Sequence, residues 1–193
     1  MALTGRGFVS VGAVAACCAL AAACSPDQSP ASTSSPTPVA ITPAESQIER
    51  QMRLDYEAAE EAYRTNISEQ DQLARRGGVG RPTARLKATA EGEYLSSVVA
   101  SLELIKRKGW RGSGSTTIAG IGRVGWQENH VKLLSCEDGS RLQLFDNSGK
   151  DVTPKGNSRF VQHLVVVQRA GRWRVSTFDS KSVKSLEGQP CAA

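Results

Sequence analysis

The spacing of apolar residues changes near Gly114, and this change narrows the range of folds more than any other feature of the chain. Before Gly114, apolar side chains recur every three or four residues, the period of an amphipathic helix. After it they alternate with polar residues, the period of a β-strand. Helices followed by strands predict an α+β domain, with N-terminal helices packed on an antiparallel sheet.

Two helical segments are expected. The first should begin at a capping box formed by residues 42–45, and it carries one apolar stripe that faces the core. The stripe consists of Ile48, Met52, Tyr56, Ala59 and Tyr63. The second segment follows Pro82 and ends in a basic turn before Gly109, a typical helix stop. Gly92 is a point at which this segment can divide into a short helix and a longer one.

Five antiparallel strands are expected after Gly114, separated by turn residues. They cover residues 116–126, 130–136, 141–145, 160–169 and 172–179. A two-residue turn at Ala170-Gly171 would place Arg169 opposite Arg172. This register puts Leu164, Val166, Trp173 and Val175 on one face, followed along it by Gln162, Thr177 and Asp179.

The opposite face of the sheet carries three valines, whereas a solvent-exposed face would carry polar residues. They are Val161, Val165 and Val167. We therefore expect this outer face to be covered. A homodimer is the simplest cover, and a crossing segment within residues 180–189 would serve equally.

The N-terminus has the order of a secretory signal, with Arg6 as its only charge, an apolar stretch over residues 8–20 and small residues before Cys24. The apolar stretch is short for a membrane span, which needs about 20 residues. The cysteine after the small residues resembles the lipobox of bacterial lipoproteins, where the thiol is acylated. The resemblance implies a signal peptide over residues 1–23 and a lipid anchor at Cys24. A box ending at Cys17 and an uncleaved anchor remain alternatives.

A tether is expected over residues 24–41, where Ser, Thr, Pro and Ala dominate and Asp27 is the only charge. The folded domain should then cover residues 42–193. With a lipid at Cys24, the expected location is the extracytoplasmic side of the cell membrane.

Several segments together resemble secreted lipoproteins of actinobacteria that contain a nuclear-transport-factor-2-like domain. The resemblance covers residues 42–191 and is carried by the Tyr56 and Tyr63 helix, the second helix, residues 134–140, residues 146–149, residues 171–175 and the final Pro190-Cys191. It implies a cone in which helices line the concave side of a curved antiparallel sheet. This fold hosts enzymes, binding modules and assembly subunits alike, so the resemblance implies no single activity.

The expected register gathers polar groups beside aromatic rings inside the cone, which is typical of a ligand pocket. The candidate pocket residues are Tyr56, Tyr63, Gln162, Trp173, Thr177 and Asp179. A closed hydrogen-bond network without a ligand is the alternative. The function expected is a membrane-tethered module of the cell envelope that binds a small ligand or a partner protein. An enzyme of the same fold that uses Asp179 as a base is a second hypothesis, and a purely structural envelope protein is a third.

Other chemistry has little support in the sequence. We find no metal-binding, phosphate-binding or dinucleotide-binding motif, so no metal, cofactor or catalytic residue is assigned. The net charge is +5, with 24 Lys and Arg against 19 Asp and Glu. Basic residues gather around the second helical segment without the aromatic residues or motifs of a nucleic-acid-binding surface, so a solvated face is the simpler interpretation.

The cysteines predict one disulfide. If Cys17 and Cys18 leave with the signal and Cys24 is acylated, Cys136 and Cys191 remain in a compartment that permits oxidation. Their pairing would hold the polar C-terminal tail against the sheet. A free thiol at Cys136 and an intermolecular bridge through Cys191 are the alternatives.

The first testable prediction concerns the anchor. Metabolic labelling with a fatty-acid analogue should mark the protein, and the Cys24→Ala variant should lose the label because its acceptor thiol is gone. Cys17→Ala serves as the matched control and should keep the label. If Cys24→Ala keeps the label, either another residue such as Cys17 is the acylation site or the lipidation hypothesis is wrong.

Overall fold

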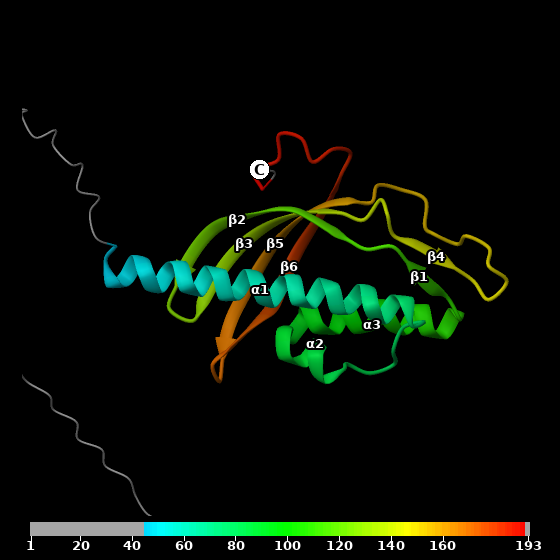
Figure 1. The fold of residues 1–193 in the computed structure, drawn as a ribbon, viewed down its shortest axis with the longest axis horizontal. Coiled ribbons are helices and arrows are strands. Elements are labelled where there is room, and N and C mark those ends of the chain that lie inside the picture. Colours follow the sequence, from blue (N-terminus) through cyan, green and yellow to red (C-terminus); the bar gives the residue numbers. More distant parts are fainter. Residues whose placement is uncertain (1–44, 192–193) are drawn as a thin grey trace, which may run out of the picture. The chain divides into compact units, whose positions relative to one another are not determined.

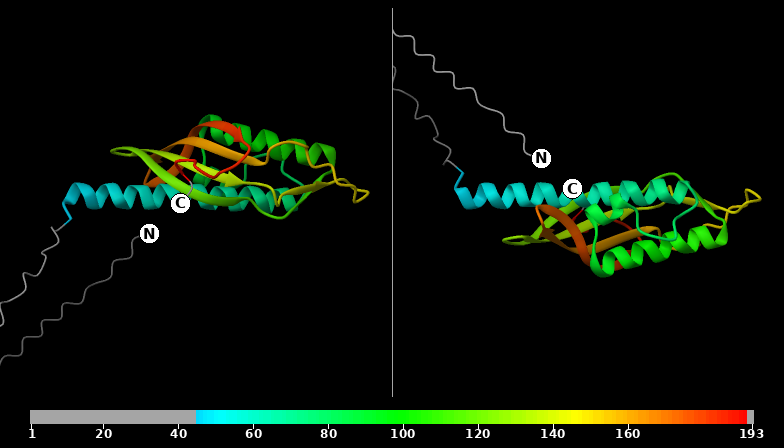
Figure 2. Two further views of the ribbon diagram at one scale, coloured as in Figure 1. Left: turned by 90° about the horizontal axis from the view of Figure 1, so that it is seen from above. Right: turned by 90° about the horizontal axis from the view of Figure 1, so that it is seen from below.

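The computed structural model describes residues 45–191, in which helices lie against one side of a curved antiparallel sheet (Figure 1). The views from above and below show α1 and α3 running along this side of the strands (Figure 2). The structure is therefore α+β, as the change of period predicts. The expected signal peptide, Cys24 and the tether lie outside the described residues.

Helix α1 spans Gln47–Arg75 and begins later than expected. Its N-cap is Ser46, whose Oγ accepts a hydrogen bond from Glu49 N at 3.2 Å, while Ser46 N donates to Glu49 Oε2 at 2.8 Å. The predicted box at residues 42–45 was wrong, because Glu45 lies outside the helix and its carboxylate pairs with Arg53 at 3.0 Å. The first turn extends past the sheet, which leaves Ile48 69% exposed (Figure 1).

The second helical segment divides at Gly92, at the point the sequence indicated. Helix α2 spans Ala84–Thr89 and helix α3 spans Gly92–Lys108. Gly92 has a φ of 58°, and a Cβ there would lie 3.1 Å from the Ser176 carbonyl oxygen. The junction therefore needs glycine both for its backbone conformation and for its close approach to the sheet.

The main sheet has four strands in the order β2-β3-β5-β6, all antiparallel. They are β2 (Thr117–Gln127), β3 (His130–Asp138), β5 (Arg159–Arg169) and β6 (Arg172–Val183). The expected third strand contributes only β4 (Gln143–Phe145), which pairs with β1 (Arg111–Ser113) in a separate two-stranded sheet. A five-stranded meander was therefore wrong, because β5 rather than β4 takes the free edge of β3. Strand β1 has three residues, too few to show an alternating pattern.

A β-bulge in β6 changes which residues face the helices. The hairpin pairs Arg169 with Arg172 as predicted, but Val166 pairs with Val175 while Val165 pairs with Thr177. Ser176 is the extra residue, and an extra residue reverses the direction of every side chain that follows it. Phe178 therefore lies on the inner face, opposite Leu164.

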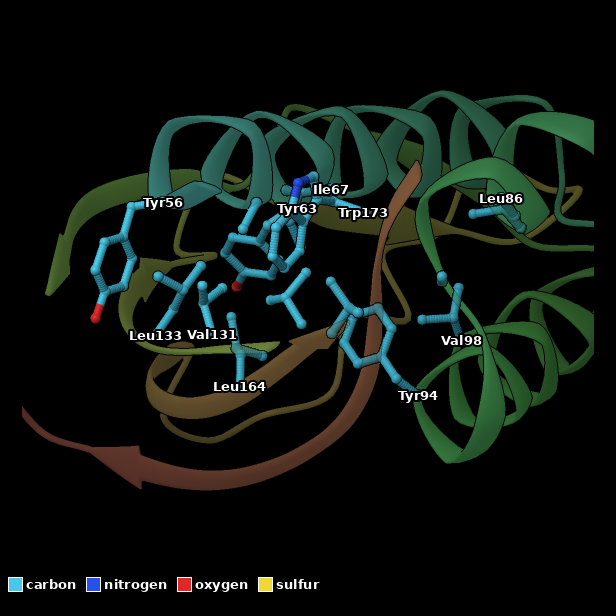
Figure 3. Packing of buried hydrophobic residues seen from close by; sticks show 14 of the residues in the cluster. Tyr56, Tyr63, Ile67, Leu86, Tyr94, Val98, Val131, Leu133, Leu164 and Trp173 are labelled. Atoms are coloured by element: carbon cyan, nitrogen blue, oxygen red, sulfur yellow. The ribbon is translucent and has the colours of Figure 1, made fainter. Parts of the chain in front are cut away.

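The core fills the space between α1, α2, α3 and the inner face of the sheet. Figure 3 shows its aromatic and aliphatic side chains, with Tyr56 at one end of the cluster and Tyr94 and Val98 toward the other. Tyr63, Leu133 and Leu164 are each no more than 1% exposed. Burial of these side chains is what holds the helices on the sheet.

A smaller cluster lies on the outer face and involves the C-terminal tail. Cys136 and Cys191 form a disulfide, with their Cα atoms 5.5 Å apart, as the sequence predicts. Both half-cystines are buried beside Leu134 and Val161. In Figure 1 the tail after β6 returns over the side of the sheet away from the helices. The tail thus covers Val161, while Val165 and Val167 stay half-buried.

The second prediction follows from this bridge. Replacing Cys191 by Ala opens a link across 55 residues of sequence, so the free energy of unfolding should fall by up to about 4 kcal/mol. Urea denaturation of the oxidised proteins measures this loss, and wild-type protein treated with reductant should approach the variant. A loss below about 1 kcal/mol, or two free thiols on peptide mapping of the oxidised wild type, would contradict the structural role.

Candidate functional site

A cavity of about 160 Å³ lies between the helices and the inner face of the sheet. Helices α1 and α3 form one wall, and β3, β5 and β6 form the other. The polar residues that line it are Gln70, Asp71, Ser97, Ser101, Thr116, Glu137 and Gln162, together with the Tyr94 hydroxyl. The apolar lining comes from Ile67, Val98 and Phe178. A mixed lining of this kind is typical of small-molecule sites.

Glu137 is the most unusual residue of this cavity. It follows Val131, Leu133 and Ser135 along the inward-facing positions of β3, so strand geometry places it under the helices. Its side chain is buried, and Oε1 has no hydrogen-bond partner among residues 45–191. Burial raises the pKa of Glu137 from 4.5 to about 7, and the Gln162 side chain partly opposes this rise. The carboxyl group can therefore gain or lose a proton near neutral pH.

Asp71 is a second buried carboxyl group, but its hydrogen bonds are complete. It accepts from Thr116 N at 2.9 Å and from Thr116 Oγ1 at 3.1 Å. These bonds connect α1 to the residue that precedes β2. Asp71 thus shapes the cavity wall, and Glu137 is the carboxyl group with an oxygen left to bind something else.

A network of amide and hydroxyl groups fixes the wall between α1 and α3. Gln70 donates from Nε2 to Asn66 Oδ1 at 2.7 Å and to the Tyr94 hydroxyl at 3.1 Å. Asn66 in turn donates to Thr89 Oγ1 at 2.9 Å. Burial raises the pKa of Tyr94 well above its usual value, which keeps this hydroxyl protonated. The Tyr94 ring also meets Phe178 edge to face, with the ring centroids 5.4 Å apart.

A larger groove of about 850 Å³ lies next to the cavity. Gln70, Asp71, Ser101 and Thr116 line both spaces. The far wall of the groove comes from β1, β4 and residues 151–160. The cavity with Glu137 and the groove are therefore neighbouring spaces that share one side.

The predicted pocket residues divide into three groups. Gln162 lines the cavity, as expected. Tyr56, Tyr63 and Trp173 belong instead to the hydrophobic core. Thr177 and Asp179 are exposed on the outer face, where Asp179 lies opposite His163 in the strand register, so placing them inside was wrong. The bulge at Ser176 is the cause, because the expected register assumed unbroken alternation.

Sequence reasoning missed Glu137, Asp71, Gln70 and Tyr94. The second strand is expected to end at residue 136, which leaves Glu137 in the following turn. If the strand continues past residue 136, Glu137 lies two positions after Ser135 and faces inward with it and Leu133. Asp71 and Gln70 are polar residues late in a long helix, and nothing in the helical period singles them out. Tyr94 lies within the second helical segment, and its position at the cavity depends on the approach of α3 to β6.

Residues 45–191 contain neither a metal-binding cluster nor a membrane-spanning helix. No group of three or more His, Cys, Asp or Glu side chains within residues 45–191 could hold a metal ion. None of the helices in that range combines the length and apolar character that crossing a membrane would require.

Comparisons with known proteins add little. The chain matches no protein-family model and no curated protein. Among solved structures, it has a weak likeness to the crystal structure of the intermembrane space region of the chloroplast protein ARC6. The TM-score is 0.41 and the sequence identity 11%, over 61% of this chain and 92% of the other.

The third prediction concerns Glu137 and pH. A carboxyl group whose pKa is higher in the folded state than in the unfolded state makes stability fall as pH rises between those two values. With a folded pKa of about 7 against 4.5, wild-type protein should lose up to about 3 kcal/mol between pH 5 and pH 8 through this group. Glu137→Gln cannot ionise and should lack this part of the pH dependence.

Urea denaturation at several pH values measures the effect. The matched control is Glu103→Gln, which changes an exposed glutamate of α3 and should keep the wild-type profile. Parallel pH profiles for wild type and Glu137→Gln would show that Glu137 ionises normally in the folded protein.

Proposed function

We propose that the protein is a lipid-anchored, extracytoplasmic binding module of an actinobacterial cell envelope, with a nuclear-transport-factor-2-like domain whose concave cavity takes a small ligand. One observation carries the ligand-binding part of the proposal. Glu137 is buried in the cavity wall with an oxygen that no described residue binds. A ligand that donates a hydrogen bond or carries positive charge would complete this site.

The physical reason is the cost of burying a carboxyl group without partners. Folding alone would favour an apolar residue at this position, since Leu133 and Val131 occupy the same face of β3. Strongly perturbed ionisable groups in concave sites are concentrated at functional positions. A binding role for Glu137 explains why a destabilising side chain is present.

The membrane-anchored part of the proposal depends on the N-terminal sequence. Cys24 follows small residues and precedes the Ser, Thr and Pro-rich tether, which would hold the domain away from the lipid surface. The disulfide between Cys136 and Cys191 supports an oxidising compartment. Partner binding through the outer face, including a homodimer across Val165 and Val167, stays a prediction.

An enzyme is a second candidate function, with Glu137 in place of the exposed Asp179. Its support is the pKa of about 7, which suits a group that both accepts and donates a proton near neutral pH. The two functions differ in what happens to the bound molecule. Recovery of an unchanged ligand after incubation favours binding, and conversion that requires Glu137 favours the enzyme.

The fourth prediction tests the cavity directly. Mature protein purified from its own membrane fraction should show, in native mass spectrometry, a small molecule bound once per chain. Glu137→Gln should lose most of this mass because the ligand loses its charged partner, and Glu103→Gln should retain it. Absence of any bound mass in the wild type, or equal retention in Glu137→Gln, would contradict a ligand site at Glu137.

A further inference from the structure

The cavity and the groove beside it indicate which class of ligand this site takes. We propose that the ligand is an elongated amphipathic molecule with a protonated amine at one end, which binds Glu137, and an apolar body that lies in the groove. The inference rests on the proposed function, since it concerns the same cavity. Three features carry it: the adjacency of the two spaces, the acidic groups at the inner end and the apolar groove walls.

The two spaces are adjacent and share part of their lining. Gln70, Asp71, Ser101 and Thr116 border both. Across the sheet, Glu137 of β3 pairs with Phe160 of β5, so the two side chains are direct neighbours on the inner face. Glu137 lines the cavity and Phe160 lines the groove. A ligand bound to the carboxyl group would therefore have its next atoms directed along Phe160.

The inner end of the site is acidic in composition. Its lining includes the carboxyl groups of Glu137 and Asp71, and no Lys, Arg or His of the described chain lines it. Asp71 already accepts two hydrogen bonds from Thr116, which leaves Glu137 Oε1 as the free acceptor. An anionic head group would meet two carboxyl groups here, whereas an ammonium group would neutralise one of them.

The groove suits an apolar body. Its walls include Ala74, Leu102, Ile105, Leu142, Leu144 and Phe160. Its volume of about 850 Å³ lies within the range of ligand pockets, about 300–1,000 Å³. Its charged residues other than Asp71 are Asp151 and Lys155, which are both exposed. A short polar ligand would fill the cavity and leave the groove walls in water.

Calorimetric titration of the mature protein with three probes tests the ligand class. The probes are dodecylamine, n-butylamine and dodecanoate, each kept below its micelle concentration. Dodecylamine should bind once per chain and at least about tenfold more tightly than n-butylamine, since the longer chain buries more apolar surface. It should also bind at least about tenfold more tightly than dodecanoate, because the charge at Glu137 discriminates between the head groups.

Two variants separate the head from the body of the ligand. Glu137→Gln should weaken both amines about tenfold or more and should not weaken dodecanoate. Leu142→Ser should weaken dodecylamine and leave n-butylamine unchanged. Glu103→Gln and Leu104→Ser, which change exposed residues of α3, are the matched controls and should bind like the wild type. Circular dichroism confirms that each variant is folded.

The outcomes distinguish this inference from the proposed function. If n-butylamine binds through Glu137 but dodecylamine binds no more tightly, the cavity is a ligand site and the groove assignment is overturned. If dodecanoate binds as tightly as dodecylamine, the amine preference is overturned. If no probe binds while native mass spectrometry shows a ligand that requires Glu137, the ligand class is wrong and the proposed function stands. If both measurements show nothing, both proposals fail.

Discussion

The contact between the α2–α3 junction and β6 is the constraint on which the rest of the domain depends. Ala90 pairs with Val175 in a parallel bridge, and Glu91 N donates to Val175 O at 2.9 Å. Gly92 then passes close to Ser176. The backbone of the junction thus satisfies groups on the last strand of the sheet, which would otherwise be an unpaired edge. Glu91 reinforces the contact through Arg169 and Arg174, each at 3.3 Å.

The bulge beside this contact also shapes the cavity. The bulge at Ser176 lies beside Gly92 and turns Phe178 inward, where it meets Tyr94 of α3. The same bulge turns Asp179 outward. A regular strand would have reversed these two positions and given the cavity a different floor. The part of the cavity wall that comes from β6 is therefore decided by one extra residue in that strand.

Features that depend on local periodicity could be predicted from the sequence, and features that depend on contacts between distant segments could not. The division at Gly92 and the Arg169–Arg172 hairpin are local and were predicted correctly. The disulfide was predicted as well, because elimination among the cysteines leaves one intramolecular pair. The bulge arises where β6 meets the helix junction, and the sequence of β6 alone does not predict it. The inward direction of Glu137 could be predicted from strand alternation. Its burial could not, because it depends on the packing of α1 and α3 against the sheet.

The length of α1 has a practical consequence for handling the protein. The helix begins at Gln47, and Gln70 at the cavity lies near its other end. At about 1.5 Å per residue, roughly 35 Å of helix separates the two. A fluorophore, affinity tag or sensor surface attached to Glu45 would thus be joined to the domain at a point remote from the cavity.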